Sequence, residues 1–106
     1  MSFFGNSPAA ASNNLNHAIE LLENNNIESA KNYLKDARYH LQSVHDIAQA
    51  KIKENKNSVS MVMSSMHYQV SFTEKHIRTI DNCLATLPYR KEHIISVLKG
   101  EKEFSE

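Results

Sequence analysis

The stretch "IESAKNYLKDARYHLQSVHDIAQA", residues 27–50, decides the fold of this chain. Its apolar and small side chains recur at alternating spacings of three and four residues, which places them on one face of an α-helix. The pattern predicts a long, straight helix that packs against its neighbours at a shallow angle. The residues of this seam are Ile27, Ala30, Leu34, Ala37, Leu41, Val44 and Ala48.

Polar stretches separate this helix from one helix before it and one after it. "ENNN" at residues 23–26 breaks the pattern, and Asn26 followed by Glu28 suits the start of a helix. "KENKNS" at residues 53–58 ends the long helix with charged and turn-forming residues. The earlier helix is predicted from the spacing of Leu15, Ala18, Ile19 and Leu22. The later helix is predicted from Val59, Val62, Met66, Val70, Thr73, Ile77, Ile80, Leu84 and Leu87.

The two ends of the chain are predicted to be looser than its centre. The first helix has two possible starts, at Ser7-Pro8 and at Ser12 or Asn13, and residues 1–12 are expected to form a flexible tail.

Pro88 is expected to stop the third helix, because it has no N–H to donate and disfavours helix at the residue before it. A short last helix would begin with Pro88 at its first position and end at Gly100, and "EKEFSE" at residues 101–106 would be a frayed tail. The buried side chains of this short helix would be Ile94, Val97 and Leu98.

The predicted fold class is all-α. With only two glycines, two prolines and no tryptophan among 106 residues, the chain favours long helices over strands joined by tight turns. We expect an antiparallel three-helix bundle over residues 13–87, followed by a short C-terminal fourth helix and tail over residues 88–106. Uninterrupted seams on so small a chain are best buried between copies, so we also expect a homo-oligomer.

Charge, hydropathy and cysteine content limit the expected partners and cellular compartment of the protein. Twelve acidic residues balance twelve lysines and arginines, so there is no basic stripe for a phosphate backbone and nucleic acid is not an expected partner. The apolar stretches are too short for membrane insertion, and the first ten residues lack the pattern of a secretory signal. Cys83 is the one cysteine, which fits a reduced, cytoplasmic setting.

The histidines offer the most reactive side chains of the sequence. If the second and third helices form a hairpin that turns near Lys56, residues whose numbers sum to about 112 lie level with each other. This register would pair His45 with His67 at the edge of one groove between the helices.

"LNHAIELLENNNIESAKNYLKDARYHLQSVHDIAQAKIKEN" and, after a short hairpin loop, "MVMSSMHYQVSF" carry a family resemblance. They are similar to the lactose/cellobiose-specific IIA component of the bacterial sugar phosphotransferase system, over roughly residues 13–87. The resemblance implies a trimeric helical phosphocarrier in sugar uptake. Its partners would be a phosphocarrier donor and a IIB-like acceptor protein.

The resemblance also assigns roles to single residues. His67 matches the histidine that accepts the phosphoryl group, Gln69 matches the glutamine two places on, and His45 would be a supporting neighbour. Val70 stands where the family has its metal-binding aspartate, and Ser71 where it has a second histidine. We therefore expect neither a metal nor a cofactor. Neutral imidazole is a competent phosphoryl acceptor near pH 7, because its free pKa lies just below that pH.

Two other functions stay open. The chain could be a non-catalytic helical interaction module that keeps the scaffold and has lost the phosphotransfer site. Alternatively, Arg38 and His45, with six residues between them, match the Arg/His spacing of HEPN-type ribonucleases, where arginine holds phosphate and histidine transfers protons.

The remaining polar candidates are predicted to be ordinary surface residues. Asp36 and His40 share a helix face, but with no third ligand they predict surface hydrogen bonding rather than a metal site. The remaining histidines, His17, His76 and His93, are expected to be solvated.

Overall fold

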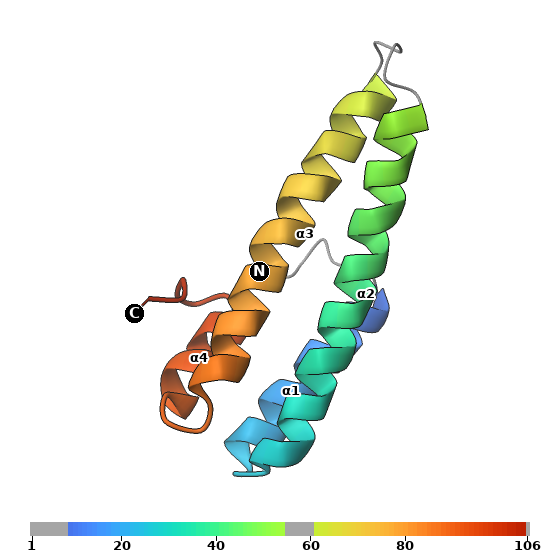
Figure 1. Cartoon of the computed structure of the whole chain (residues 1–106). Coiled ribbons are helices and arrows are strands. Elements are labelled where there is room, and N and C mark those ends of the chain that lie inside the picture. Colours follow the sequence, from blue (N-terminus) through green and yellow to red (C-terminus); the bar gives the residue numbers. More distant parts are fainter. Residues whose placement is uncertain (1–8, 55–60, 106) are drawn as a thin grey trace.

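The computed structural model describes residues 9–54 and 61–105, with side chains described from residue 63 in the second of these ranges. In these ranges the chain forms four helices and no strand (Figure 1): α1 (Ala9–Glu23), α2 (Ile27–Glu54), α3 (Met61–Thr86) and α4 (Lys91–Leu98). The prediction of an all-α fold with a short fourth helix is confirmed.

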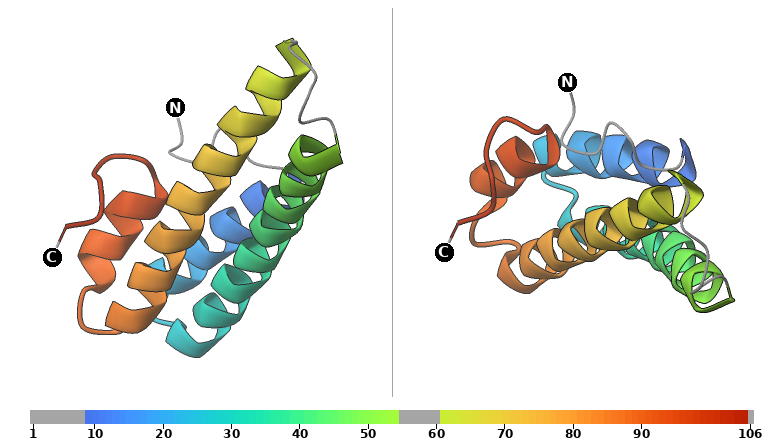
Figure 2. Two further views of the ribbon diagram at one scale, coloured as in Figure 1. Left: turned by 45° about the horizontal axis from the view of Figure 1, so that its top comes forward. Right: turned by 90° about the horizontal axis from the view of Figure 1, so that it is seen from above.

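α2 is the central element of the bundle. It packs against both α1 and α3, and α4 packs against α1. Seen from above, α1 and α4 lie in one row and the α2–α3 hairpin lies in the other (Figure 2). The shared core between the rows contains buried side chains from all four helices.

Most of the seam that decides the fold is buried, whereas Ile27 and Val44 are half-buried. In α2 the side chains of Ala30, Leu34, Ala37, Leu41 and Ala48 are all fully buried, and all of them except Ala48 belong to the core cluster. In α3 the buried side chains include Thr73, Ile77 and Ile80, Leu87 is buried just after the end of α3, and in α4 the buried side chains include Ile94, Val97 and Leu98. The spacing of three and four residues therefore identified the faces that pack into the core. Of the other residues predicted for this face of α3, Met66, Val70 and Leu84 are half-buried, and Val59 and the side chain of Val62 lie outside the described residues.

α1 ends in a hydrogen-bonded motif that "ENNN" makes possible. Asn25 has φ 62°, its N–H donates to the Leu22 carbonyl at 3.1 Å, and the Asn26 N–H donates to the Leu21 carbonyl at 2.7 Å. This is the Schellman arrangement, and Asn is one of the few residues that tolerates its left-handed position. α2 then starts directly after Asn26, as predicted.

α4 ends in the same way. Gly100 has φ 82°, its N–H donates to the Val97 carbonyl at 3.0 Å, and the Glu101 N–H donates to the Ser96 carbonyl at 2.9 Å. The prediction that Gly100 follows the last helix is confirmed.

Three expectations about the ends of the chain need correction. α1 includes Ala9–Ser12 of the expected tail, because Ala11 is fully buried and extends the seam of α1 by one turn, and the possible start at Ser7-Pro8 lies outside the described residues. Pro88 lies in the turn before α4 rather than at its first position, and Arg90 is the N-cap. Residues 101–105 do not fray, because Phe104 packs against the core.

Among the histidines expected to be solvated, His76 is only 3% exposed and His93 is half-buried, whereas His17 is exposed. The prediction for His76 is wrong because this residue lies on the side of α3 that turns away from solvent. Its ring is next to that of Phe72, at 4.0 Å between the ring centroids.

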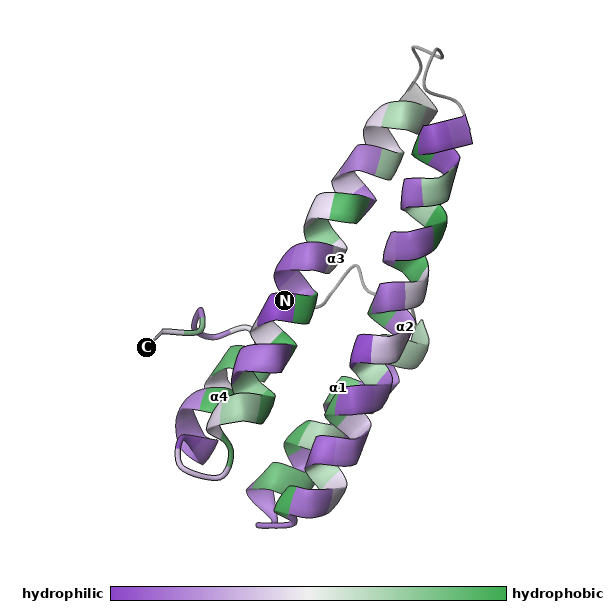
Figure 3. Ribbon diagram, in the orientation of Figure 1, coloured by the Kyte–Doolittle hydropathy of each residue, from purple (hydrophilic) through white to green (hydrophobic). Residues whose placement is uncertain are grey.

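The core fills only one half of the α2–α3 hairpin. In α2 the buried core cluster ends at Leu41, and in α3 it begins at Ile77. Both helices continue well beyond these residues, past the end of α1, toward the hairpin tip (Figure 1). We call this part, residues 44–54 and 61–73, the arm. Apolar residues recur along both of its helices (Figure 3).

Candidate functional site

Two ion pairs join α2 to α3 along one edge of the hairpin. Arg38 donates from Nε to Oδ1 of Asp81 at 2.6 Å and from Nη2 to Oδ2 at 3.3 Å. His45 Nε2 lies 3.1 Å from Oε1 of Glu74. In each pair the residue numbers sum to 119, so the two pairs define one antiparallel register.

This register corrects the expected pairing of His45 with His67. His45 faces Glu74, and His67 stands seven residues before Glu74 on α3. Seven residues are about two helical turns, so His67 lies on the same side of α3 but about 10 Å nearer the tip. The hairpin is offset by one heptad from the expected register, and the two histidines do not form one site.

The ring of His45 is held at both nitrogens. Besides the contact of Nε2 with Glu74, Nδ1 lies 3.2 Å from Oδ1 of Asp46, which also accepts from the Gln42 amide at 3.0 Å. The hydrogen bond to Glu74, followed by that to Asp46, raises the pKa of His45. The Gln42 and His45 hydrogen bonds in turn lower the pKa of Asp46. When the ring is protonated, it donates to a carboxylate from each nitrogen, so it connects the two helices and has no nitrogen left to act as a base.

Next to this ion pair, a hollow of about 240 Å³ opens between α2 and α3. Its lining combines one apolar side chain, Ile77, with four polar ones, Gln42, His45, Glu74 and Arg78. Arg78 is exposed and forms no hydrogen bond or ion pair with any described residue. The two carboxylates nearest to it along α3, Glu74 and Asp81, are already engaged by α2.

The proposed phosphoryl acceptor is accessible. His67 is exposed, and Ser64 and Ser71, three residues before it and four after it, share its helical face and are also exposed. Gln69 is half-buried, and at two residues' distance it lies on another side of α3. The structure therefore brings His67 together with two hydroxyl groups, and with neither Gln69 nor His45. Val70 is half-buried.

The other sequence candidates take structural roles. Both donor positions of Arg38 on this side are occupied by Asp81, so an RNA phosphate would have to displace a carboxylate that is bound at two points. No group of three or more His, Cys, Asp or Glu side chains in the described ranges could hold a metal ion, and Asp36 with His40 makes no exception. Burial raises the pKa of the Cys83 thiol to about 12, which makes it a poor nucleophile.

Apolar side chains of the arm are the second feature that could serve a function. Ile47 is 58% exposed and Tyr68 is 59% exposed, which is unusual for side chains of this size. On α3 the rings of Tyr68, Phe72 and His76 form a column, with centroid distances of 5.9 and 4.0 Å. The column leads from the buried core out onto the arm.

Glu74, Asp81 and Arg78 were not predicted from the sequence. A signal for the first two was present: Arg38 and His45 are seven residues apart on α2, and Glu74 and Asp81 are seven apart on α3. Opposite charges at matched heptad spacing indicate an antiparallel pairing of the two edges. Nothing in the spacing singles out Arg78.

Comparison of the chain with family models, curated proteins and solved structures finds no match. Within residues 9–54 and 61–105, no helix combines the length and the apolar character that crossing a membrane requires.

Proposed function

We propose that this protein is a non-catalytic helical interaction module that associates through the arm. The observation that carries this proposal is that the hairpin of α2 and α3 extends further than the core that covers it. The core cluster is bounded by Leu41 and Ile77, whereas the two helices reach to Glu54 and Met61. Within residues 9–54 and 61–105, no third helix continues alongside the arm, so part of its apolar seam faces water. Covering that seam supplies the free energy of association.

The partner we propose is a second copy of the chain. Two helices of one arm and two of another make a four-helix bundle, the arrangement that buries seams of heptad spacing on all sides. An antiparallel arrangement suits the charges, because Lys51 and Lys53 lie near the tip of α2 and Asp46 lies nearer its base, with its side chain 66% exposed. An antiparallel dimer places the tip of one arm against the base of the other, so that the lysines of one copy lie near Asp46 of the other.

Sedimentation equilibrium of the full chain tests this proposal. The wild type is expected to be a dimer at micromolar concentration, and Ile47→Glu is expected to raise the dissociation constant about 30-fold, which corresponds to about 2 kcal/mol. The matched control is Tyr39→Ser, because Tyr39 is 68% exposed and lies on α2 outside the arm. A wild type that stays monomeric at about 100 μM, or equal effects of the two substitutions, would contradict the proposal.

A second candidate function is acceptance of a phosphoryl group at His67, as in the IIA-like phosphocarriers. The observation that favours it is the exposed imidazole on the outer side of the arm, with Ser64 and Ser71 on the same helical face. Hydroxyl groups can donate to phosphoryl oxygens, and an exposed ring is within reach of a donor protein. The setting would be cytoplasmic, where the single thiol of Cys83 remains reduced.

Phosphoryl transfer is tested with a histidine-phosphocarrier donor system and radiolabelled phosphoenolpyruvate. Acid-labile label on the wild type that is absent from His67→Ala, and present on His17→Ala, supports the carrier function. If the wild type stays unlabelled while its helical content is intact, this second function is excluded and the interaction module is unaffected.

A further inference from the structure

Residues 101–105, which we call the strap, lie against α3 and α4 although they contain no helix or strand. Phe104 is the centre of the contact. Its half-buried ring packs against the core cluster, the Arg90 guanidinium lies 5.2 Å from the ring centroid, and the His93 ring lies at 5.6 Å. An aromatic side chain held between a cation, an imidazole and an apolar core is typical of an anchor residue in peptide recognition.

The backbone of the strap is bound as well. The Ser105 N–H donates to Nε2 of His93 at 3.2 Å, and the Ser105 carbonyl accepts from Nη1 of Arg90. Burial, followed by the charges of Arg90 and Lys102, lowers the pKa of His93, which keeps Nε2 available as an acceptor. His93 and Arg90 therefore hold the backbone N–H and the backbone carbonyl of Ser105, a contact that does not depend on the side chain of residue 105.

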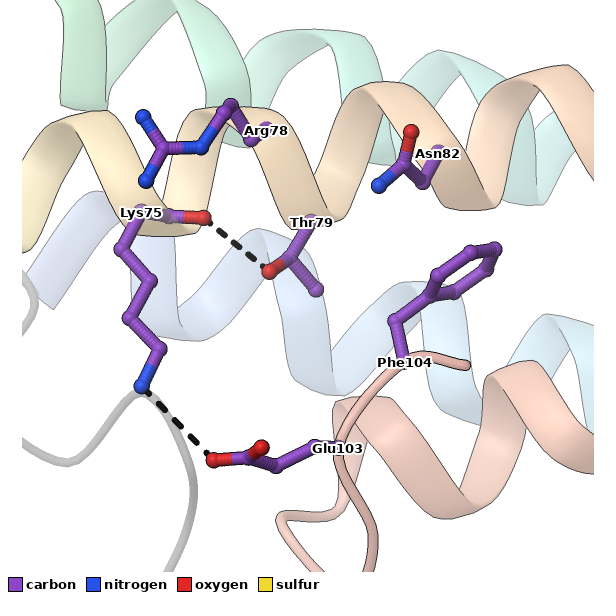
Figure 4. A pocket seen from close by; sticks show the side chains of 6 residues that line it. All are labelled: Lys75, Arg78, Thr79, Asn82, Glu103 and Phe104. Carbon is purple, nitrogen blue, oxygen red and sulfur yellow. Dashed lines mark hydrogen bonds and ion pairs between the residues drawn. The ribbon is translucent and has the colours of Figure 1, made fainter. Parts of the chain in front are cut away.

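An acidic residue precedes the anchor. Glu103 lies 3.8 Å from Nζ of Lys75 on α3 (Figure 4). Beside this pair is a hollow of about 180 Å³, lined by Lys75, Arg78, Thr79, Asn82, Glu103 and Phe104. The lining contains two cationic side chains, Lys75 and Arg78, and one carboxylate, Glu103, so its net charge is positive by one. Arg78 supplies that charge, since it has no carboxylate partner among the described residues.

We propose that this surface of α3 and α4 is a binding site for a short acidic peptide with an aromatic anchor, and that residues 103–105 occupy it in cis. The site would recognise three features: a phenyl ring, the carboxylate of the preceding residue, and the backbone N–H and carbonyl of the following residue. The unfilled part of the hollow and the unpaired guanidinium of Arg78 leave room for one more acidic group than the strap provides. Because the strap is attached to the chain, it competes at an effective concentration of roughly millimolar, so a partner peptide has to displace it.

The probe is a fluorescein-labelled peptide with the sequence of residues 101–106, "EKEFSE", and the readout is fluorescence anisotropy. Phe104→Ala in the full chain removes the cis anchor and empties the site. We expect this variant to bind the peptide at least about tenfold more tightly than the wild type. Adding Arg90→Gln or Arg78→Gln to Phe104→Ala should weaken binding, and Tyr89→Ala, whose side chain is 92% exposed, should leave it unchanged.

Circular dichroism shows whether Phe104→Ala keeps its helices. If it unfolds, Ser105→Pro takes its place, because it removes the N–H that donates to His93 and retains the aromatic ring. The same peptide with alanine in place of phenylalanine should not bind to either variant. The proposal is overturned if the emptied site and the wild type bind the peptide equally, or if neither binds it at about 1 mM.

Discussion

His45 on α2 and Glu74 on α3 lie 3.1 Å apart, between Nε2 and Oε1, and this pair together with Arg38 and Asp81 fixes how the two long helices are aligned. Both pairs lie on the same edge of the hairpin, seven residues apart on each helix. One pair lies beside the core and the other lies near the base of the arm. The alignment determines which apolar side chains the arm presents.

The His45 pair is expected to stabilise the hairpin in a pH-dependent way. The pKa of His45 is raised, so its contribution is complete below about pH 6.5, the ordinary histidine value, and is lost as the pH rises through the raised value. His45→Gln should lower the free energy of unfolding by about 0.5–1 kcal/mol at pH 6 and by less at pH 9. Urea unfolding at both pH values, in a double-mutant cycle with Glu74→Gln, measures the coupling. Equal coupling at the two pH values would contradict the assignment.

His76 is expected to have the opposite pH dependence. Burial lowers its pKa to about 4, so its protonation opposes folding. The stability that depends on neutral His76 is complete above about pH 6.5 and falls as the pH drops toward 4, by up to roughly 3 kcal/mol. Compared with His76→Leu, the wild type should lose this additional stability in thermal unfolding between pH 6.5 and 4. His17→Gln is the control and should keep the wild-type profile, because His17 is exposed.

Gly100 is expected to be needed for its backbone conformation. At φ 82° a Cβ atom would lie close to the following carbonyl, a strain of about 1–2 kcal/mol for most residues. Gly100→Ala should therefore reduce the free energy of unfolding by about 1 kcal/mol, and Glu101→Ala, at the next residue with an exposed side chain, should have little effect. Chemical denaturation of each variant measures this difference. An unchanged midpoint for Gly100→Ala would show that the backbone at residue 100 adopts another conformation without a loss of stability.

The packed faces could be predicted from the sequence, because the spacing of apolar residues depends on the helix alone. The alignment of α2 with α3 could not be predicted from that spacing. The expected and observed registers differ by one heptad, and sliding a heptad seam by seven residues leaves the apolar contacts matched. Only the charged residues at the edge, Arg38 and His45 against Asp81 and Glu74, distinguish the two registers.

The candidate site was harder to predict than the fold for the same reason. The position of His67 relative to His45 depends on the register, so an error of one heptad brought together residues that lie two turns apart. The burial of His76 and the docking of Phe104 depend on contacts between elements distant in the sequence. His76 stands three residues after Thr73 and four before Ile80, so its spacing fits the packed face of α3, but a histidine side chain does not mark a core position. No local pattern at Phe104 indicates its contact. Exposure of His67 and Ile47 likewise follows from where α1 and the core end.

The measurement that tests the central claim most directly is amide hydrogen exchange of the full chain at several protein concentrations. If the arm is the surface through which two copies associate, protection of amides in residues 44–54 and 61–73 should increase with concentration. Amides of α1 and α4 should exchange at the same rate throughout. Exchange in the arm that is independent of concentration up to about 100 μM, or concentration-dependent protection confined to the other elements, would contradict the account.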